Sequence, residues 1–201
     1  MGRNETGVMA ALTNRRSDQP PPDEPRSRGE IVMGLLQQTT PEAAYQWMKE
    51  QELTRFRPFN VVFGDRNRFY VFGDKGFDKP KSLQPGNYAL SNSHLDDITW
   101  PKVARSHAFL SETAHLPGEA LLSRLHHFLG DSSPPDQEDS EEVGLETHGA
   151  FGAVFIRHPD YGTVSSSIYT AGSLGERMYY AEGPDLERDP PTAFRLIPME
   201  S

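Results

Sequence analysis

The sequence contains no cysteine. This absence excludes disulfide bonds, thiolate metal sites, iron–sulfur clusters and a cysteine nucleophile within these 201 residues. No apolar run is long enough to span a bilayer, and the first residues lack the basic-then-apolar order of a secretory signal peptide. We therefore expect a soluble, cytoplasmic protein with no membrane insertion.

Positively charged residues are fewer than negatively charged ones. The chain has 20 Lys and Arg against 29 Asp and Glu, which gives a formal net charge of −9. This balance argues against non-specific nucleic-acid binding and against an anionic membrane surface as partner. Six of the acids lie between Asp131 and Glu142 without a single base. We interpret residues 131–148 as an acidic, disordered insertion in one domain, and the oligomeric state stays open.

Periodicity and turn signals predict the elements of the first half. A buried strand is expected at 7–14 and a proline-rich loop at 15–26. A helix begins near Ser27, where Ser27 and Glu30 have capping-box spacing, and another begins at Thr40-Pro41. The strongest hairpin pattern pairs residues 59–64 with 69–73, and a further strand is expected at 88–92.

The sequence pattern of the second half predicts two helices followed by three strands. The helices span residues 101–113 and 117–129, and the strands span 151–157, 164–170 and 177–182. The tail at 183–201 has the composition of a loop. Because runs of strands alternate with helix pairs, the order favours α+β layers over a doubly wound parallel sheet.

Five segments occur in the order that they have in one known family. They are AALTNRR (10–16), RGEIV (28–32), FNVVFGD (59–65), PGNYALSN (85–92) and YGTVSSSIYT (161–170). In this order they resemble the NRDE family, also called the transport and Golgi organisation protein 2 family. The match covers residues 1–182 apart from the acidic insertion.

The resemblance implies an α+β, N-terminal-nucleophile (Ntn)-hydrolase-like fold, an αββα sandwich of two antiparallel sheets between helices. Family members begin with Met-Cys and carry an Asn-Arg-Asp-Glu signature, and this sequence has neither. We therefore interpret it as N-terminally truncated, with a fold that is incomplete at its N-terminal strand. In related hydrolases the cysteine attacks an amide carbonyl and its own amine acts as base. We expect no hydrolysis from this chain as written, whereas a true start further upstream would restore a C–N amide hydrolase.

Two asparagines match positions that are functional in related hydrolases. The resemblance implies that Asn14 donates to a developing oxyanion and that Asn92 orients nucleophile or substrate. The alternative is that both are strand-end asparagines that hold turns. Val164 departs from the family pattern, which has arginine there, and valine neither donates a hydrogen bond nor carries charge.

A haem or lipid-metabolite binding and trafficking role is the alternative function that the resemblance implies. Haem would need an axial ligand, and His94 and His107 are the candidates, although no haem motif is present. The histidines have no metal-ligand spacing, so we expect no metal site. A third interpretation is a mis-started protein whose strand edges lack partners. A small-molecule ligand is the expected partner.

Overall fold

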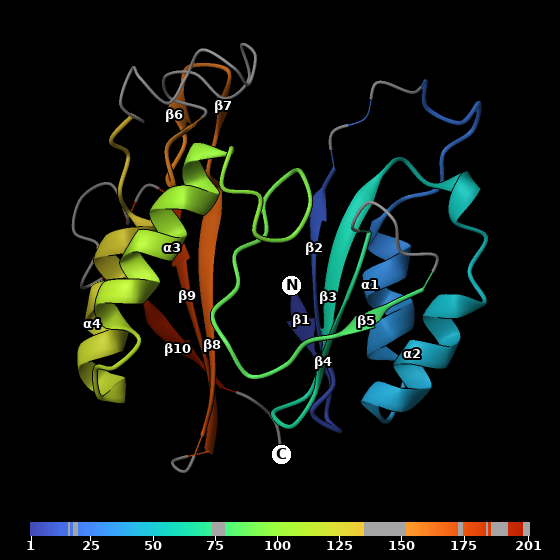
Figure 1. Cartoon of the computed structure of the whole chain (residues 1–201), viewed down its shortest axis with the longest axis horizontal. Helices are drawn as coiled ribbons and strands as arrows, with labels where there is room; N and C mark the ends of the chain where they lie inside the picture. The colour runs from blue at the N-terminus through green and yellow to red at the C-terminus, as the bar shows by residue number, and fades with distance from the viewer. Residues whose placement is uncertain are drawn as a thin grey trace. The chain divides into compact units, whose positions relative to one another are not determined.

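The computed structural model describes residues 1–15, 17, 20–73, 79–134, 152–172, 175–183, 185 and 193–198. The chain divides into two compact units, Met1–Asp96 and Asp97–Ser201, and Figure 1 shows the elements of each. Both units combine helices with antiparallel strands, which confirms the predicted α+β class. No helix within the described ranges has the length and apolar character needed to cross a bilayer. Residues 135–148 of the predicted insertion lie outside the described residues.

The first unit contains an antiparallel sheet with its strands in chain order. These strands are β1 (Gly2–Arg3), β2 (Met9–Asn14), β3 (Phe59–Gly64), β4 (Phe69–Phe72) and β5 (Lys81–Ser82). The strand expected at 7–14 and the hairpin of 59–64 with 69–73 are thereby confirmed. The Asp65 carboxylate closes the hairpin, because it accepts the N–H groups of Asn67 at 2.8 Å and Arg68 at 3.0 Å.

Helices α1 (Gly29–Leu36) and α2 (Pro41–Lys49) lie on one face of this sheet (Figure 1). The Thr40 hydroxyl caps α2, as predicted, by accepting the N–H of Ala43 at 3.1 Å. At the start of α1, Glu30 reaches back to the N–H of Ser27 at 3.1 Å, also as predicted. The Ser27 hydroxyl accepts instead from the neighbouring Gly29.

The core of the first unit lies between the helices and the sheet. Alternate residues of β3 (Phe59, Val61 and Phe63) are buried in it. The other main contributors are Val8, Ala10, Ile31, Leu35, Ala44, Met48, Phe56, Tyr70 and Phe72. Each such large apolar side chain contributes about 1.5–3 kcal/mol through burial. Asn60, between Phe59 and Val61, points to the opposite face of the sheet. A buried polar side chain therefore lies on the face of β3 that is turned away from this core.

The prediction of a strand at 88–92 is wrong. Residues 88–90 have no regular secondary structure and residues 91–92 form a bend, because side chains satisfy the backbone here in place of a neighbouring strand. Asn60 and Thr13 donate to the carbonyl of Ser91, while Asp96 exchanges two hydrogen bonds with Ala89 through its carboxylate and its N–H. Asp96 has a φ of 57°, a left-handed conformation that ends any extended run.

The second unit contains helices α3 (Pro101–Thr113) and α4 (Gly118–Leu129), as predicted. Strands β8 (Ser165–Gly172) and β9 (Gly175–Glu182) form the expected hairpin. The rings of His126 on α4 and Tyr179 on β9 lie 6.3 Å apart, so α4 packs on this sheet. Among the described residues of this unit, the buried apolar cluster comprises Phe155 and Ala181, with Ala193 and Phe194 partly buried against them.

Two expectations for the second unit are wrong. Within the described part of 151–157, only Arg157 is in a strand, where β6 (Arg157–His158) pairs with β7 (Tyr161–Gly162). The backbone before it bonds elsewhere, since Phe155 donates to the carbonyl of Asp131 and Ile156 donates to the Thr163 hydroxyl. The tail expected to be loop-like contributes β10 (Arg195–Ile197), which pairs with β9.

Candidate functional site

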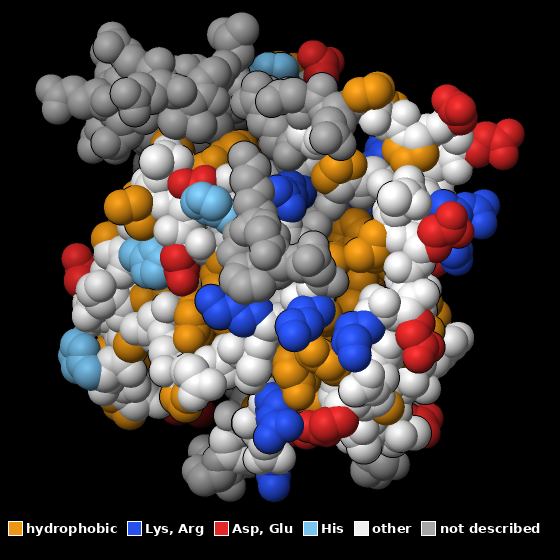
Figure 2. Space-filling view, turned by 45° about the vertical axis from the view of Figure 1, so that its right-hand side comes forward, with side chains coloured by type: hydrophobic (Ala, Val, Ile, Leu, Met, Phe, Trp, Pro, Cys, Tyr) orange, Lys and Arg blue, Asp and Glu red, His pale blue; other side chains and the backbone are white. Residues whose placement is uncertain are grey.

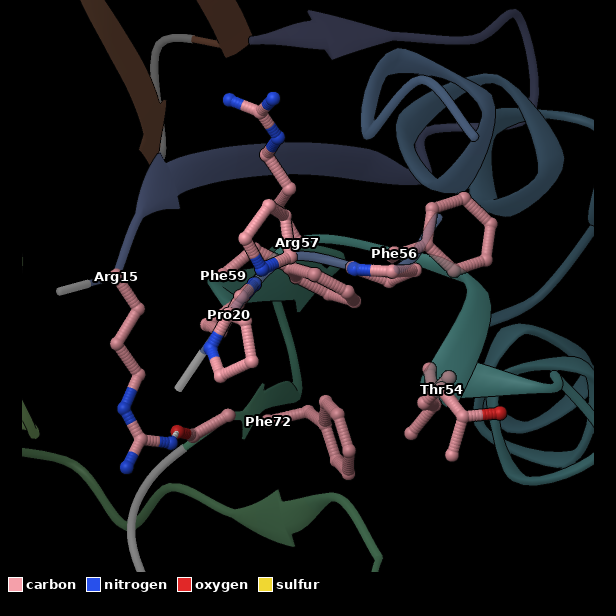
Figure 3. A pocket seen from close by; sticks show the side chains of 12 residues that line it. Arg15, Pro20, Thr54, Phe56, Arg57, Phe59 and Phe72 are labelled. Carbon is pink, nitrogen blue, oxygen red and sulfur yellow. Dashed lines mark hydrogen bonds between the residues drawn. The ribbon is translucent and has the colours of Figure 1, made fainter. Parts of the chain in front are cut away.

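Two pockets open at the end of the first sheet where β2 ends and β3 begins. The first, which we name the aromatic cavity, has a volume of about 480 Å³. It is lined by Arg15, Pro20, Pro21, Pro22, Leu53, Thr54, Phe56, Arg57, Pro58, Phe59, Phe72 and Gly73. Figure 3 shows the Phe59 ring near the middle of this group, with Phe56 and Phe72 further out, and the guanidinium groups of Arg15 and Arg57 point away from each other.

The apolar wall of the aromatic cavity belongs to the core and is therefore fixed. The Phe59 ring centroid lies 6.1 Å from that of Phe56 and 6.3 Å from that of Phe72, within the range of favourable aromatic pairs. All three side chains are less than a tenth exposed. Thr54, by contrast, is an exposed rim residue of the short helix η1 (Leu53–Arg55). The cavity is thus a rigid aromatic surface with a polar edge.

One cation of the aromatic cavity is held by the backbone carbonyl of a glycine at the end of β4. Arg15 donates from its guanidinium to the carbonyl of Gly73. Gly73 has a φ of +104°, and a Cβ there would lie 2.3 Å from the carbonyl oxygen of Phe59. Only glycine fits this close approach, so the end of β4 positions the arginine beside the rings.

The second pocket, which we name the arginine pocket, has a volume of about 450 Å³. It is lined by Leu12, Asn14, Pro25, Arg26, Ser27, Arg28, Gly29 and Arg57. Arg57 therefore lines both pockets. Figure 2 shows that hydrophobic side chains lie next to Lys and Arg side chains on the face of the molecule that it displays.

The three arginines of the arginine pocket differ in how their charge is compensated. Arg26 donates to the Glu30 carboxylate at 2.9 Å, and this hydrogen bond lowers the pKa of Glu30. Arg28 donates to the carbonyl of Pro58 at 3.0 Å, which fixes its position, and it has no ion pair with a carboxylate among the described residues. Arg57 has no hydrogen bond or ion pair with any residue that the structure describes. Within the part of the chain that the structure describes, two of the three cations are thus without a carboxylate partner.

The two asparagines singled out in the sequence lie next to each other. The side-chain amide of Asn92 donates to the backbone carbonyl of Asn14 at 2.7 Å. The side chain of Asn14 lines the arginine pocket and is exposed. Asn92 therefore ties a loop to the end of β2, and the roles in oxyanion binding or orientation stay predictions.

A buried amide behind the sheet holds the Asn92 loop in place. Asn60 is fully buried, and its amide donates to the carbonyls of Ser91 at 3.2 Å and Ser93 at 2.7 Å. Thr13, opposite Asn60 in the β2–β3 register, also donates to Ser91 at 2.7 Å. These bonds position the residue between the two serines, Asn92.

The histidine candidates lie outside both pockets. His94 is half-buried in the loop of the first unit, and His107 is half-buried on α3 of the second unit. Neither is among the residues that line the aromatic cavity or the arginine pocket. Over the described ranges, no cluster of three or more His, Asp or Glu residues suits a metal ion.

The sequence patterns did not single out the arginines that build the pockets. Arg15, Arg28 and Arg57 are scattered along the chain, and only folding brings them to one end of the sheet. A signal was present for Asn60, because a polar residue in the apolar run FNVVFG predicts a buried, hydrogen-bonded amide. The alternation in Arg55-Phe56-Arg57 likewise predicts a buried ring between two exposed cations.

Comparisons with known proteins agree on one family. A sequence model described as "Transport and Golgi organisation 2" matches residues 1–183. The chain is 25% identical to the mouse "Transport and Golgi organization 2 homolog" over 203 residues, which cover 94% of this chain and 72% of the relative. It is 27% identical to the bovine homolog, covering 94% of this chain and 73% of that protein. The human homolog is 26% identical over 204 residues, which cover 94% of this chain and 72% of that protein.

Proposed function

Since the chain belongs to the Transport and Golgi organisation 2 family, we propose that it is a binding protein that holds an amphipathic anion in the aromatic cavity without cleaving it. The names of the relatives contain the word transport, and carriage of a small molecule is the simplest biochemical form of transport. The expected ligand is an apolar molecule with an acidic group at one end.

The composition of the aromatic cavity carries this proposal. Its volume of about 480 Å³ falls in the range of small-molecule pockets, about 300–1,000 Å³. Rings of Phe56, Phe59 and Phe72 offer apolar contact, and Arg15 and Arg57 stand at its edge. An apolar ligand with one acid would bury its body against the rings and pair its charge with a guanidinium.

The Ntn-hydrolase-like αββα arrangement belongs to the same proposal. In its support, the first unit has an antiparallel sheet with two helices on one face, and Asn92 is bonded to the end of the strand that carries Asn14. The 201 residues contain no cysteine. This polypeptide therefore has no thiolate to attack an amide, and we propose binding without turnover.

Haem is not the ligand that the aromatic cavity fits best. Haem iron in proteins takes histidine, cysteine, methionine or tyrosine as axial ligand. The described residues that line the cavity include none of these four types. An apolar acid that needs no metal ligation agrees better with arginine, proline and phenylalanine walls.

A charge reversal at the rim of the cavity tests the proposal. Thr54 is exposed, so Thr54→Glu adds a negative charge beside the cavity without disturbing the core. Binding of a pyrene-labelled fatty acid, followed by its fluorescence, is expected to be saturable and to weaken severalfold in Thr54→Glu. Thr54→Gln is the control, because glutamine has nearly the same shape as glutamate but carries no charge. This variant should bind like the parent chain.

Two results contradict the proposal. The first is binding that does not saturate, or that falls equally in Thr54→Gln and Thr54→Glu. The second is release of product from a chromogenic acyl amide above the buffer rate, since that outcome removes the claim that the ligand is held without cleavage.

A further inference from the structure

We propose that the arginine pocket is a phosphate-binding subsite in which Arg28 and Arg57 hold the phosphate and the side-chain amide of Asn14 donates to it. The three side chains come from β2, from the residue before α1 and from the segment before β3, and they line one pocket of about 450 Å³. This site is distinct from the aromatic cavity, although Arg57 borders both.

The arginine pocket keeps a net positive charge after the ion pairs among its described residues are taken into account. Glu30 compensates Arg26, at 2.9 Å. Among the described residues, no carboxylate pairs with Arg28 or Arg57. Two guanidinium groups in one concavity repel each other unless an anion lies between them, so an anionic ligand removes an unfavourable interaction.

The donors match a phosphate better than a carboxylate. A guanidinium has five N–H groups in a planar fork, and Arg28 uses one N–H donor atom on the carbonyl of Pro58. The Asn14 side chain has no hydrogen bond with the described residues and adds two N–H donors. A phosphate monoester has about −1.5 to −2 charge and three terminal oxygens, which suits two cations and an amide.

The backbone at the start of α1 does not supply the site. The N–H of Gly29 donates to the Ser27 hydroxyl, and those of Glu30 and Ile31 donate to the carbonyls of Ser27 and Arg28. The side chains therefore have to provide the affinity, and this makes the proposal testable by substitution.

The position of Arg57 also defines the class of ligand. A pocket of this volume is larger than one phosphate group, and its neighbour across Arg57 is apolar. The ligand class is therefore a phosphate-bearing molecule whose apolar part reaches the aromatic cavity. This last step rests on the proposed function, whereas the phosphate subsite does not.

A titration with inorganic phosphate and with phenyl phosphate tests the subsite on the full chain. The probe signal is the NMR shift of the arginine Nε–H groups, at an ionic strength kept constant with potassium chloride. Arg57→Gln is expected to weaken phosphate binding by about tenfold or more, because a charge-assisted hydrogen-bond pair is lost. Arg57→Lys should recover only part of the affinity, since an ammonium lacks the planar fork.

Arg55→Gln is the matched control. Arg55 is an exposed arginine two residues away that lines neither pocket, so its loss should leave phosphate affinity unchanged. The proposal is overturned if Arg55→Gln weakens binding as much as Arg57→Gln, if acetate binds as tightly as phosphate, or if phosphate does not saturate. Phosphate binding that persists when the labelled fatty acid fails to bind would leave the subsite standing and remove the proposed function.

Discussion

The side-chain amide of Asn92 donates a hydrogen bond of 2.7 Å to the backbone carbonyl of Asn14, which is 78 residues away in the chain. This bond joins the loop after β5 to the last residue of β2. It also gives the side-chain amide of Asn92 a backbone partner, whereas the side chain of Asn14 lines the arginine pocket. Substitutions that destabilise the loop carrying Asn92 are therefore expected to disturb the end of β2, where Asn14 lines the arginine pocket.

Removing the buried amide of Asn60 is expected to destabilise the first unit. Asn60→Ala leaves the carbonyls of Ser91 and Ser93 without this donor in a buried setting, at a cost of about 1–3 kcal/mol. The free energy of unfolding in urea measures the loss. Asn67→Ala, in an exposed turn, is the control and should change stability by less than about 0.5 kcal/mol; equal effects would contradict the role of Asn60.

Removing the cap of α2 should have a smaller effect. Thr40→Ala deletes the hydroxyl that accepts the N–H of Ala43 and is expected to destabilise by about 1 kcal/mol. The neighbouring Thr39 is exposed and makes no such bond among the described residues. Thr39→Ala should therefore be neutral in the same thermal-unfolding measurement, and a loss in Thr39→Ala that matches Thr40→Ala would show that the cap is unimportant.

Two glycines in helices are expected to respond to alanine with opposite sign. In Gly34→Ala the new Cβ would lie 2.0 Å from the Trp47 ring, so the ring or the helices must shift, at a cost of about 1–3 kcal/mol. Gly118→Ala places its Cβ in open space and should stabilise α4 slightly through helix propensity, by up to about 1 kcal/mol. Thermal unfolding compares the two, and a neutral Gly34→Ala would contradict the close helix contact.

The second unit should lose stability in acid through Asp131. Burial raises the pKa of Asp131, but the hydrogen bonds from Ser133 and the charge of Arg105 outweigh it, and its pKa lies below the ordinary value of 3.8. A carboxyl whose pKa is lower in the folded state stabilises the fold above its unfolded pKa, and this stabilisation disappears as the pH falls through the folded pKa.

Asp131→Asn should therefore be less stable than the parent chain at neutral pH, by about 1 kcal/mol or less after solvent screening. The difference should vanish below the folded pKa, which chemical denaturation at several pH values measures. Because Arg105 and Asp131 form one ion pair, the double variant with Arg105→Gln should lose less than the sum of the single losses. Additive losses would contradict the coupling.

Local signals were sufficient to predict most helices and the hairpins. Thr40-Pro41 and Pro101 begin helices because their caps and fixed φ act within a few residues. The errors concern segments whose backbone partners are distant in the chain. The run at 88–92 has strand composition, yet the carbonyl of Ser91 accepts hydrogen bonds from the side chains of Asn60 and Thr13, which no local pattern reveals.

The pockets could not be predicted for the same reason. Arg15, Arg28 and Arg57 become neighbours only through the β2–β3 register and the parallel bridge between Arg26 and Phe56. Asn14 and Asn92 were identified by a resemblance, and their hydrogen bond depends on the burial of Asn60 behind the sheet. Composition excluded classes of function, whereas the site required the tertiary fold.

The two units differ in how much apolar material protects their hydrogen bonds. The first has twelve buried residues in one cluster, whereas the described part of the second has a cluster of two. Amide protons of β8 and β9 should then exchange with solvent through frequent local opening, while those of β3 should exchange only when the whole unit unfolds. A protease that acts on transiently opened chain would therefore cut first in the second half.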